Sequence, residues 1–494
     1  MTVIPFRPRT TNAGRLTTAE QLTAVFTHPG LYAMADAVPA KDRVGRPRVF
    51  PSYLLLGFGA LARVYRSGSR AAHELTDPAT WRTVRDAVGA AATTYDLDID
   101  LPGDRPPDWD AYRYARNHHL TAPDTLAAMR AAFTLSAVDQ ARVFGLLNPS
   151  GPGSLCHPDP TRTIYGDGTV VRPMYRPPAA RRTTDKATGE TVITYLDAKG
   201  DPIDAPEHRF DPDAADYHGH TGSVHGQNFI AWSVRGPQHH QRVVLAVDRV
   251  PRPGLEADAS VALLKALHTV AGTGIQAVAY DGAFRGRHID EVMTDCGLVV
   301  INKVHASATT AARKGKAADP RWHALGTWEH DTSTGACIHH LAAVDGAVSE
   351  IGLDDAGRQV VLHRLERKHV KRPRRASGRY HFNVAYDVPC PGGAFQAWVT
   401  PHALADEADH RRADAVRVIA EGEAEFATLY GLRNDAESFN AQLKRTLLVD
   451  RAMSLGGARQ LLDVLCFAHL HNATNALRAG VLPVVGERRL RVVA

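Results

Sequence analysis

Three acidic residues stand where a folded chain could use them for metal chemistry. Asp167 lies in the run Tyr165 to Thr169, which reads Y-G-D-G-T. Asp281 follows the apolar run Ile275 to Tyr280, and Glu437 lies in a pattern that predicts a helix. Sheets of α/β proteins bind ligands at the carboxyl ends of strands, and the glycines beside both aspartates let a ligand approach closely. Carboxylates suit Mg²⁺ or Mn²⁺, although an isolated Asp-Gly is more often a turn.

The segment around Glu437 is more specific, because Tyr430, Arg433, Glu437 and Lys444 form the pattern Y-x2-R-x3-E-x6-K. On a helical wheel they fall at roughly 0°, 300°, 340° and 320°, which is one narrow polar stripe. A separate apolar stripe on the same wheel comprises Leu429, Leu432, Ala436, Phe439, Leu443 and Leu447. The helix should therefore pack by its apolar side and present the polar set to one neighbour. Such a set suits a phosphodiester beside a metal ion; the alternative is a solvated face with an Arg433 to Glu437 pair.

The elements that must position these residues change in kind along the chain. From Thr17 to about Leu147 the periodicity is mostly helical, and Thr17 with Glu20 predicts a capping box. Pro51 to Arg66 and Arg70 to Leu75 predict two helices around a Gly-containing turn. This pair resembles a helix-turn-helix, although any packing αα-hairpin looks similar.

After a Gly/Pro-rich break the pattern changes to strands. Strands are predicted at Thr163 to Val171, Phe229 to Val234, Val243 to Val247, Ile275 to Tyr280 and Leu298 to Val304, and helices at Ala257 to Val270 and Gly286 to Cys296. This order predicts a mixed α/β sheet with flanking helices. Arg172 to Gly222 is a charged, Pro-rich excursion, of a length that function or disorder usually explains.

The region from His305 to about Ala405 is again strand-like and has the character of an insertion. Its candidate strands are Ile338 to Val344, Val360 to Leu365, Tyr380 to Val388 and Phe395 to Val399. Two long helices are predicted after it, at about Asp409 to Leu448 and at Ser454 to Ala479.

Composition limits the class of protein. A chain of 494 residues exceeds the roughly 250 to 300 at which one core stops growing, so we expect two or three domains. The 44% hydrophobic and 22% charged residues are ordinary for a globular protein, and the net charge of +5 permits an anionic partner without requiring one. No apolar run approaches the roughly 18 residues that cross a bilayer, and five scattered cysteines suit reduced thiols. We therefore expect a cytoplasmic protein that does not bind a membrane.

Together, the acidic motifs and the helical signature resemble DDE insertion-sequence transposases with a Y-R-E-K box. In that family the first acid lies in an Asp-Gly-Thr strand motif, as in Asp167 to Thr169, and the second commonly heads Asp-x-x-Phe/Tyr, as in Asp281 to Phe284. The longer gap, before Glu437, holds the strand-rich insertion, as the family would have it. The resemblance covers about Arg162 to Ala479. It departs at Ala441, where some members carry another basic residue.

The resemblance implies a fold and a domain organisation. The fold class would be α/β: a ribonuclease H-like mixed sheet flanked by helices, with a β-rich insertion and an all-α N-terminal domain. The implied divisions are a helical DNA-binding domain at 1–150, a catalytic domain at 160–304 and 406–480, the β-rich insertion at 305–405, and a C-terminal tail at 481–494.

The resemblance also implies an activity: metal-dependent DNA cleavage at transposon ends and strand transfer into target DNA. Asp167, Asp281 and Glu437 would be catalytic and would hold two Mg²⁺ ions about 4 Å apart, with Mn²⁺ able to substitute. Arg433 and Lys444 would position phosphates, and Tyr430 would contact the strand near the cleaved bond. The implied partners are double-stranded DNA, from the transposon ends and the target, and a second copy of the chain in the synaptic complex, in a nucleoid-associated location. Two alternatives remain: a host-adopted DNA-binding regulator without catalysis, and a ribonuclease H-like nuclease without strand transfer.

The densest basic run lies in the expected insertion. It comprises Arg364, Arg367, Lys368, Lys371, Arg372, Arg374, Arg375 and Arg379. Clustered Lys and Arg displace counterions from DNA, so we expect DNA contacts from this run, by Lys368, Lys371, Arg372, Arg374 and Arg375. A solvated hairpin tip is the alternative.

Two histidine-rich groups could be zinc ligands. They are His218, His220 and His225, and Cys337 with His339 and His340. Neither spacing matches a structural zinc motif well, so the sequence favours no zinc site at either.

Overall fold

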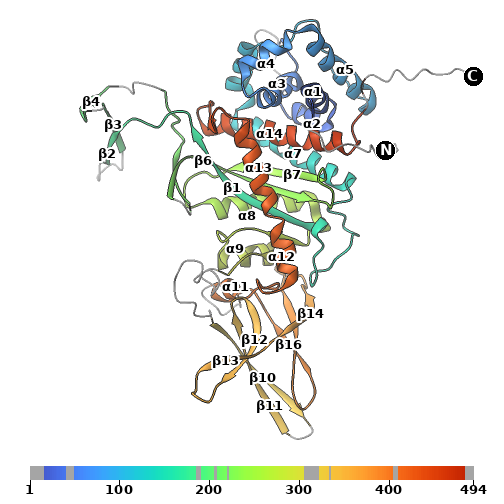
Figure 1. Cartoon of the computed structure of the whole chain (residues 1–494), viewed down its shortest axis with the longest axis vertical. Coiled ribbons are helices and arrows are strands. Elements are labelled where there is room, and N and C mark those ends of the chain that lie inside the picture. The colour runs from blue at the N-terminus through green and yellow to red at the C-terminus, as the bar shows by residue number, and fades with distance from the viewer. Residues whose placement is uncertain are drawn as a thin grey trace, which may run out of the picture.

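In a computed structural model, the elements form three tiers along the long axis of the molecule (Figure 1). Helices from the first part of the chain lie at one end, a mixed sheet with flanking helices lies in the middle, and a β-rich region lies at the other end. The structure describes residues 16–39, 49–184, 191–197, 199–204, 209–219, 222–304, 322–332, 335–403, 410–483 and 485. Among these residues no helix is long and apolar enough to cross a bilayer.

The described chain before residue 150 is built from helices. They are α1 (Thr18–Thr27), α2 (Pro29–Asp36), α3 (Ser52–Val64), α4 (Gly68–Leu75), α5 (Pro78–Tyr95), α6 (Trp109–Ala115), the π-helical turn η1 (Arg116–Leu120) and α7 (Pro123–Val143). The predicted capping box is present at the start of α1, where the Glu20 N–H donates to Thr17 Oγ1 at 3.2 Å and the Thr17 N–H donates to Glu20 Oε2 at 2.8 Å. The predicted helical pair corresponds to α3 and α4.

The central sheet has the strand order β7-β6-β1-β8-β9. Its strands are β1 (Thr163–Pro173), β6 (Gly222–Arg235), β7 (Arg242–Arg249), β8 (Ala277–Ala279) and β9 (Val299–Ile301), and all five overlap predicted strands. β6 runs antiparallel to β1 and β7, whereas β8 runs parallel to β1 and β9. Two short strands extend the sheet: β5 (Ala215–Gly219) pairs with β6, and β17 (Arg451–Ala452) pairs with β1. The predicted mixed α/β class is confirmed.

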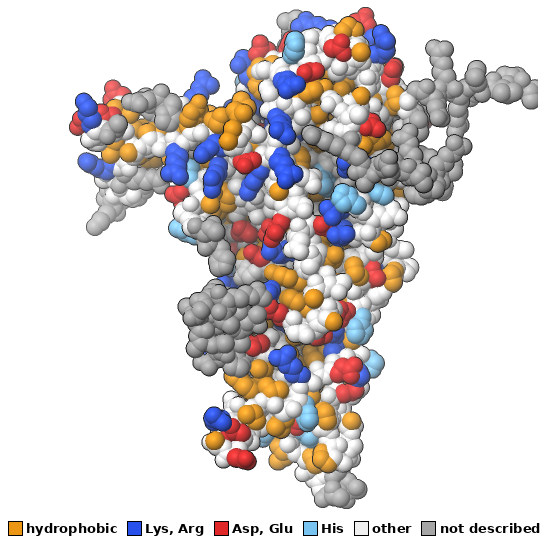
Figure 2. Space-filling view, in the orientation of Figure 1, with side chains coloured by type: hydrophobic (Ala, Val, Ile, Leu, Met, Phe, Trp, Pro, Cys, Tyr) orange, Lys and Arg blue, Asp and Glu red, His pale blue; other side chains and the backbone are white. Residues whose placement is uncertain are grey.

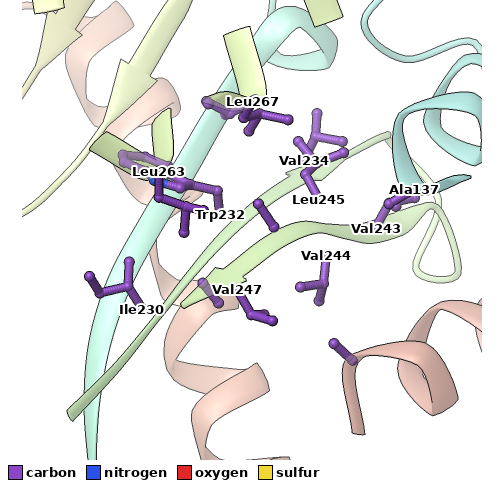
Figure 3. Packing of buried hydrophobic residues seen from close by; sticks show 14 of the residues in the cluster. Ala137, Ile230, Trp232, Val234, Val243, Val244, Leu245, Val247, Leu263 and Leu267 are labelled. Carbon is purple, nitrogen blue, oxygen red and sulfur yellow. The ribbon is translucent and has the colours of Figure 1, made fainter. Parts of the chain in front are cut away.

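Helices cover the sheet because its strands are apolar on both sides. Every residue from Val243 to Val247 in β7 is buried, a pattern typical of a strand covered on both faces. α8 (Glu256–Ala271) packs on β6 and β7, and Figure 3 shows its Leu263 and Leu267 beside Trp232. Trp232 Nε1 also donates to the Ser260 carbonyl at 3.1 Å, which fixes α8 on β6. α7 and α14 (Gly457–Arg478) pack against β7 as well, and α9 (Gly286–Glu291) with the π-helical turn η4 (Val292–Cys296) connects β8 to β9.

The excursion between β1 and β6 contains a small antiparallel sheet that the sequence pattern did not predict. Its strands are β2 (Ala180–Thr184), β3 (Thr191–Leu196) and β4 (Pro202–Ile203), and they extend away from the central sheet (Figure 1). Val192 and Ile193 are exposed, so these strands lack the buried apolar face by which sequence patterns reveal a strand.

The β-rich region comprises two antiparallel sheets. The first has the order β10-β11-β12-β13 and the second β14-β15-β16. The strands are β10 (Trp322–Thr332), β11 (Gly335–Val344), β12 (Ala347–Leu353), β13 (Gln359–Arg364), β14 (Glu366–Lys371), β15 (Asn383–Val388) and β16 (Phe395–Val399). All four strands predicted for this region overlap strands of the structure. Part of the expected insertion, 305–321, and most of the expected tail at 481–494 lie outside the described residues.

The single helix predicted at about Asp409 to Leu448 is wrong. The structure has three helices there: α11 (Arg411–Ala415), α12 (Ala424–Gly431) and α13 (Asn434–Arg445). Between α11 and α12 the Val418 carbonyl accepts a hydrogen bond from Arg367 of β14, instead of taking part in a helical hydrogen bond. The chain is therefore not helical between α11 and α12, where it makes this contact with β14. The second predicted helix is confirmed as α14.

Candidate active site

Strand register brings Asp167 and Asp281 to the same end of the central sheet. In the parallel pair of β1 and β8, Tyr165 lies level with Ala279. Each aspartate follows two residues later on its own segment, so the two lie level just where β8 ends. Asp281 Oδ1 accepts the Ala283 N–H at 2.9 Å, which holds its carboxylate in the turn after the strand.

Glu437 approaches the same place from α13, which packs against β1. Arg433 makes the link: its Nη1 donates to Asp167 Oδ1 at 3.2 Å, and its Nη2 donates to Glu437 Oε1 at 3.0 Å. Asn440 Nδ2 donates to the other oxygen of Asp167 at 3.2 Å. Two side chains from the α13 segment therefore hold Asp167 beside Glu437.

The apolar side of this helical segment anchors it as predicted. Leu429, Ala436, Phe439, Leu443 and Leu447 are buried, and Leu432 is partly buried. A buried ion-pair cluster adds to the anchor, because Asp435 accepts from Arg235 at 2.8 Å and from Arg242 at 2.9 Å. These contacts set the orientation in which Glu437 and Arg433 meet the sheet.

The charge balance at Asp167 is unfavourable for a carboxylate. Burial raises the pKa of Asp167 from its usual 3.8 to about 7, although Arg433 opposes the rise. Asp281, Glu256 and Glu437 each push this pKa further up. One guanidinium thus faces four carboxyl groups, and a divalent cation would restore the balance.

Glu256 is a fourth carboxyl group that sequence reasoning missed. It is the first residue of α8, and its carboxylate accepts from Asn228 Nδ2 at 2.6 Å and from the Tyr280 hydroxyl at 3.2 Å. Burial raises the pKa of Glu256, and Asp281 adds to the rise. One sequence signal could have identified Glu256. It is an acidic residue at the start of the helix that follows β7, the third strand of the central sheet in chain order.

The glycines beside Asp167 have a different role from the one expected. A Cβ at Gly168 would lie 2.6 Å from the Glu256 carboxyl group, and a Cβ at Gly166 would lie 2.6 Å from the Trp232 ring. The two glycines therefore admit protein side chains instead of a ligand. At Gly282, beside Asp281, a Cβ would meet no described atom within 4 Å, so this glycine faces open space.

Tyr430 and Lys444 lie at the margins of the site. The Arg433 guanidinium carbon lies 5.8 Å from the centre of the Tyr430 ring. Burial and the nearby Arg172 lower the pKa of Lys444, while Asp167 raises it, which places the ammonium group within electrostatic reach of that carboxylate. Asn440 belongs to the same set and was missed, although it falls at about 280° on the helical wheel, next to Arg433.

The carboxylates match a hard cation in chemistry but are not drawn tightly together. Among the described residues, no three of these carboxyl groups each place an oxygen atom within 4.8 Å of the other two. Arg433 acts as the counter-ion between Asp167 and Glu437. A bound cation would take over that role and free the guanidinium for a phosphate oxygen.

Some basic residues of the run in the β-rich region are buried or paired within the protein, whereas others are exposed. Arg367 is buried, Arg372 donates to the Gly297 carbonyl, and Arg379 pairs with Asp290 and Asp295. Lys368 is half-buried and pairs with Glu366 at 2.8 Å. Of the five expected DNA contacts, the exposed ones are Lys371, Arg374 and Arg375.

A second basic group lies closer to the carboxylates. Arg172, Arg176 and Arg451 line one small cavity, and Arg172 lies opposite Arg451 where β1 pairs with β17. Figure 2 shows Lys and Arg side chains gathered over the region where Figure 1 labels β6, α13 and α14, with acidic side chains beside them. The sequence pattern did not single out this group, because Arg451 lies far along the chain from Arg172 and Arg176.

The chain matches no family model and no curated protein sequence. Its function is therefore argued from the geometry of the site.

Proposed function

We propose that this protein is a DDE transposase, which cuts DNA at the ends of its own element and joins those ends to target DNA. The observation that carries the proposal is that Asp167, Asp281 and Glu437 lie near one another at one end of the sheet, although they are far apart in the sequence. The Tyr430, Arg433 and Lys444 side chains accompany them. This combination favours phosphoryl transfer over a purely structural role for the carboxylates.

The sheet topology supports a ribonuclease H-like catalytic domain. In the order β7-β6-β1-β8-β9, β6 alone runs against the other four strands, and this is the arrangement expected of such a domain. The position of β10 to β16 between β9 and α12 supports the proposed β-rich insertion. The proposed divisions remain 1–150, 160–304 with 406–480, 305–405 and 481–494.

The residues of the site have distinct proposed roles. Asp167, Asp281 and Glu437 would hold two Mg²⁺ ions, which Mn²⁺ could replace, and the ions would supply activation of a water or 3′ hydroxyl and stabilisation of the leaving oxygen. Arg433 and Lys444 bind phosphate oxygens, and Tyr430 contacts the strand near the cleaved bond. Glu256 adds negative charge next to Asp167 and strengthens the demand for cations.

Glu437→Gln tests the proposal. The variant keeps the shape of the side chain and its contact with Arg433 but loses the charge, so we expect it to bind DNA within about threefold of the original chain and to lose cleavage by at least ~10³-fold. The measurement uses duplexes that carry the DNA flanking this gene, with supercoiled plasmid as target, in Mg²⁺ or Mn²⁺. Nicked ends and joined products are resolved on denaturing gels.

Asp139→Asn is the matched control, because it removes a carboxylate that is 74% exposed on α7 and remote from the site. It should cleave and join like the original chain. Full activity in Glu437→Gln would disprove the assignment. DNA binding without metal-dependent nicks would favour the host-adopted regulator, and nicks without joined products would favour a nuclease that does not transfer strands.

A further inference from the structure

Three residues of the β-rich region form a cluster that the proposed DNA chemistry does not use. His330, His339 and Cys390 each offer a ligand atom, and these atoms all lie within 4.8 Å of one another. In the part of the chain that the structure describes, no other group of three His, Cys, Asp or Glu residues meets this distance. Cys337 lies beside this group, since its thiol contacts the thiol of Cys390.

Strand register explains how the cluster forms. In the antiparallel pair of β10 and β11, His330 lies directly opposite Cys337. His339 follows Cys337 by two residues and so projects from the same face of the hairpin. Cys390 comes from the segment after β15, and β16 lies against β10. His330, His339 and Cys390 therefore meet where one sheet of the region faces the other, with Cys337 next to Cys390.

The histidines present free nitrogen atoms at this point. His339 is 5% exposed, and its Nδ1 donates to the buried Glu350 carboxylate at 2.6 Å. This bond leaves the lone pair on Nε2, which is buried and has no hydrogen-bond partner. His330 Nδ1 is also buried without a partner, while its ring stacks on Phe395 at 4.5 Å. A buried nitrogen without a partner is costly, and a metal ion would satisfy it.

The sulfur atoms are suited to the same ion. The Cys390 sulfur lies within 4.8 Å of the ligand nitrogens of His330 and His339. The thiolate is the form of cysteine that binds metals.

We propose that His330, His339, Cys337 and Cys390 bind a structural Zn²⁺ ion that joins the two sheets of the β-rich region. Two nitrogen and two sulfur ligands without an oxygen ligand are the donor set of closed, tetrahedral zinc sites. The Glu350 carboxylate orients His339 in the way that acidic groups orient zinc-bound histidines. Binding displaces the thiol protons to solvent and adds a cross-link between the two sheets.

The site differs from both groups that the sequence suggested. Cys337 and His339 belong to it, but His340 projects from the opposite face of β11, where it contacts Thr327 at 3.2 Å. His220, of the other group, lies outside the described residues. The sequence concealed the site because Cys390 belongs to a second hairpin, which the fold brings against the first.

The metal content of the purified full chain tests the proposal. We expect about one zinc ion per chain by inductively coupled plasma mass spectrometry, and less than about a fifth of that in Cys390→Ser and in His339→Ala. His340→Ala is the matched control and should retain zinc. Near-ultraviolet circular dichroism shows whether each variant is folded.

Cobalt substitution of the unaltered chain gives a readout that does not depend on a folded variant. The chain, stripped with a chelator and refilled with Co²⁺, should show the visible bands of tetrahedral cobalt and a sulfur-to-cobalt charge-transfer band. A chain that takes up neither ion, or variants that retain full zinc, would overturn the proposal. A Cys337–Cys390 disulfide in a peptide map of the native chain would overturn it as well. None of these outcomes bears on the proposed transposase activity.

Discussion

At the residue scale, the protonation of Asp167 distinguishes the candidate site from an ordinary surface cluster. Its carboxyl group is largely buried and accepts from Arg433 and Asn440, yet its pKa lies near 7 because burial and the neighbouring carboxyl groups outweigh the single guanidinium. A group whose pKa is raised on folding contributes stability at low pH, and that contribution is lost as the pH rises through the folded-state value.

Asp167→Asn should therefore remove a pH-dependent loss of stability. Without metal, the original chain loses this contribution between about pH 4 and pH 8, by at most about 4 kcal/mol for a shift of roughly three units. We expect the variant to melt at a higher temperature than the original chain at pH 8 and to differ little at pH 4, in scanning fluorimetry with EDTA. Mg²⁺ should reduce the difference at pH 8, because it binds only the intact carboxylates. Parallel curves for both proteins would contradict the prediction.

At the element scale, one side chain, Arg367, contacts several segments around the break between α11 and α12. The Arg367 side chain from β14 is 4% exposed. It pairs with Glu423 at 2.9 Å and Glu425 at 2.7 Å, and its Nε donates to the Cys156 carbonyl at 3.0 Å. The β-rich region is thereby tied to the segment that leads into α12 and α13.

Arg367→Met should destabilise the protein by about 3 to 5 kcal/mol, because it leaves two carboxylates and two carbonyl oxygens without their partner. Urea unfolding followed by fluorescence measures the change. Arg375→Ala removes an exposed arginine of the same run and should change stability by less than about 0.5 kcal/mol. Equal stability of the two variants would show that the buried contacts of Arg367 do not hold these elements together.

At the scale of the whole molecule, the described residues include basic groups in two separate regions. One is the exposed Lys371, Arg374 and Arg375 in the β-rich region, and the other is the exposed Arg172 and Arg176 with the half-buried Arg451 at β1 and β17. Both groups suit contact with the DNA backbone under the proposed function, because clustered Lys and Arg displace its counterions.

Replacing Lys371, Arg374 and Arg375 together by Ala should weaken DNA binding to a similar extent for all sequences. We expect the slope of log affinity against log salt concentration to fall in magnitude by up to about 2.7, which is roughly 0.9 for each lost phosphate contact. Fluorescence anisotropy titrations between low and moderate salt measure the slope. Arg358→Ala, which removes an exposed arginine paired with Asp354 at 2.8 Å in the same region, should leave the slope unchanged. An unchanged slope in the triple variant would show that these three residues do not contact DNA phosphates.

The sequence by itself determined the features that depend on local periodicity. The five strands of the central sheet, the capping box at Thr17 and the apolar side of the Glu437 helix all follow from patterns within one segment, and the structure confirms them. Asp167, Asp281 and Glu437 could be chosen because each is marked by its neighbours in the chain.

The tertiary structure decided what depends on segments that meet only after folding. Glu256 joins the carboxylates because α8 packs on the sheet beside Gly168, and Arg367 of β14 bonds the Val418 carbonyl in the non-helical segment before α12. The cluster of His330, His339 and Cys390 combines two hairpins. Backbone propensity and apolar spacing carry no information on such contacts, since their energy comes from hydrogen bonds and charges supplied by distant parts of the chain.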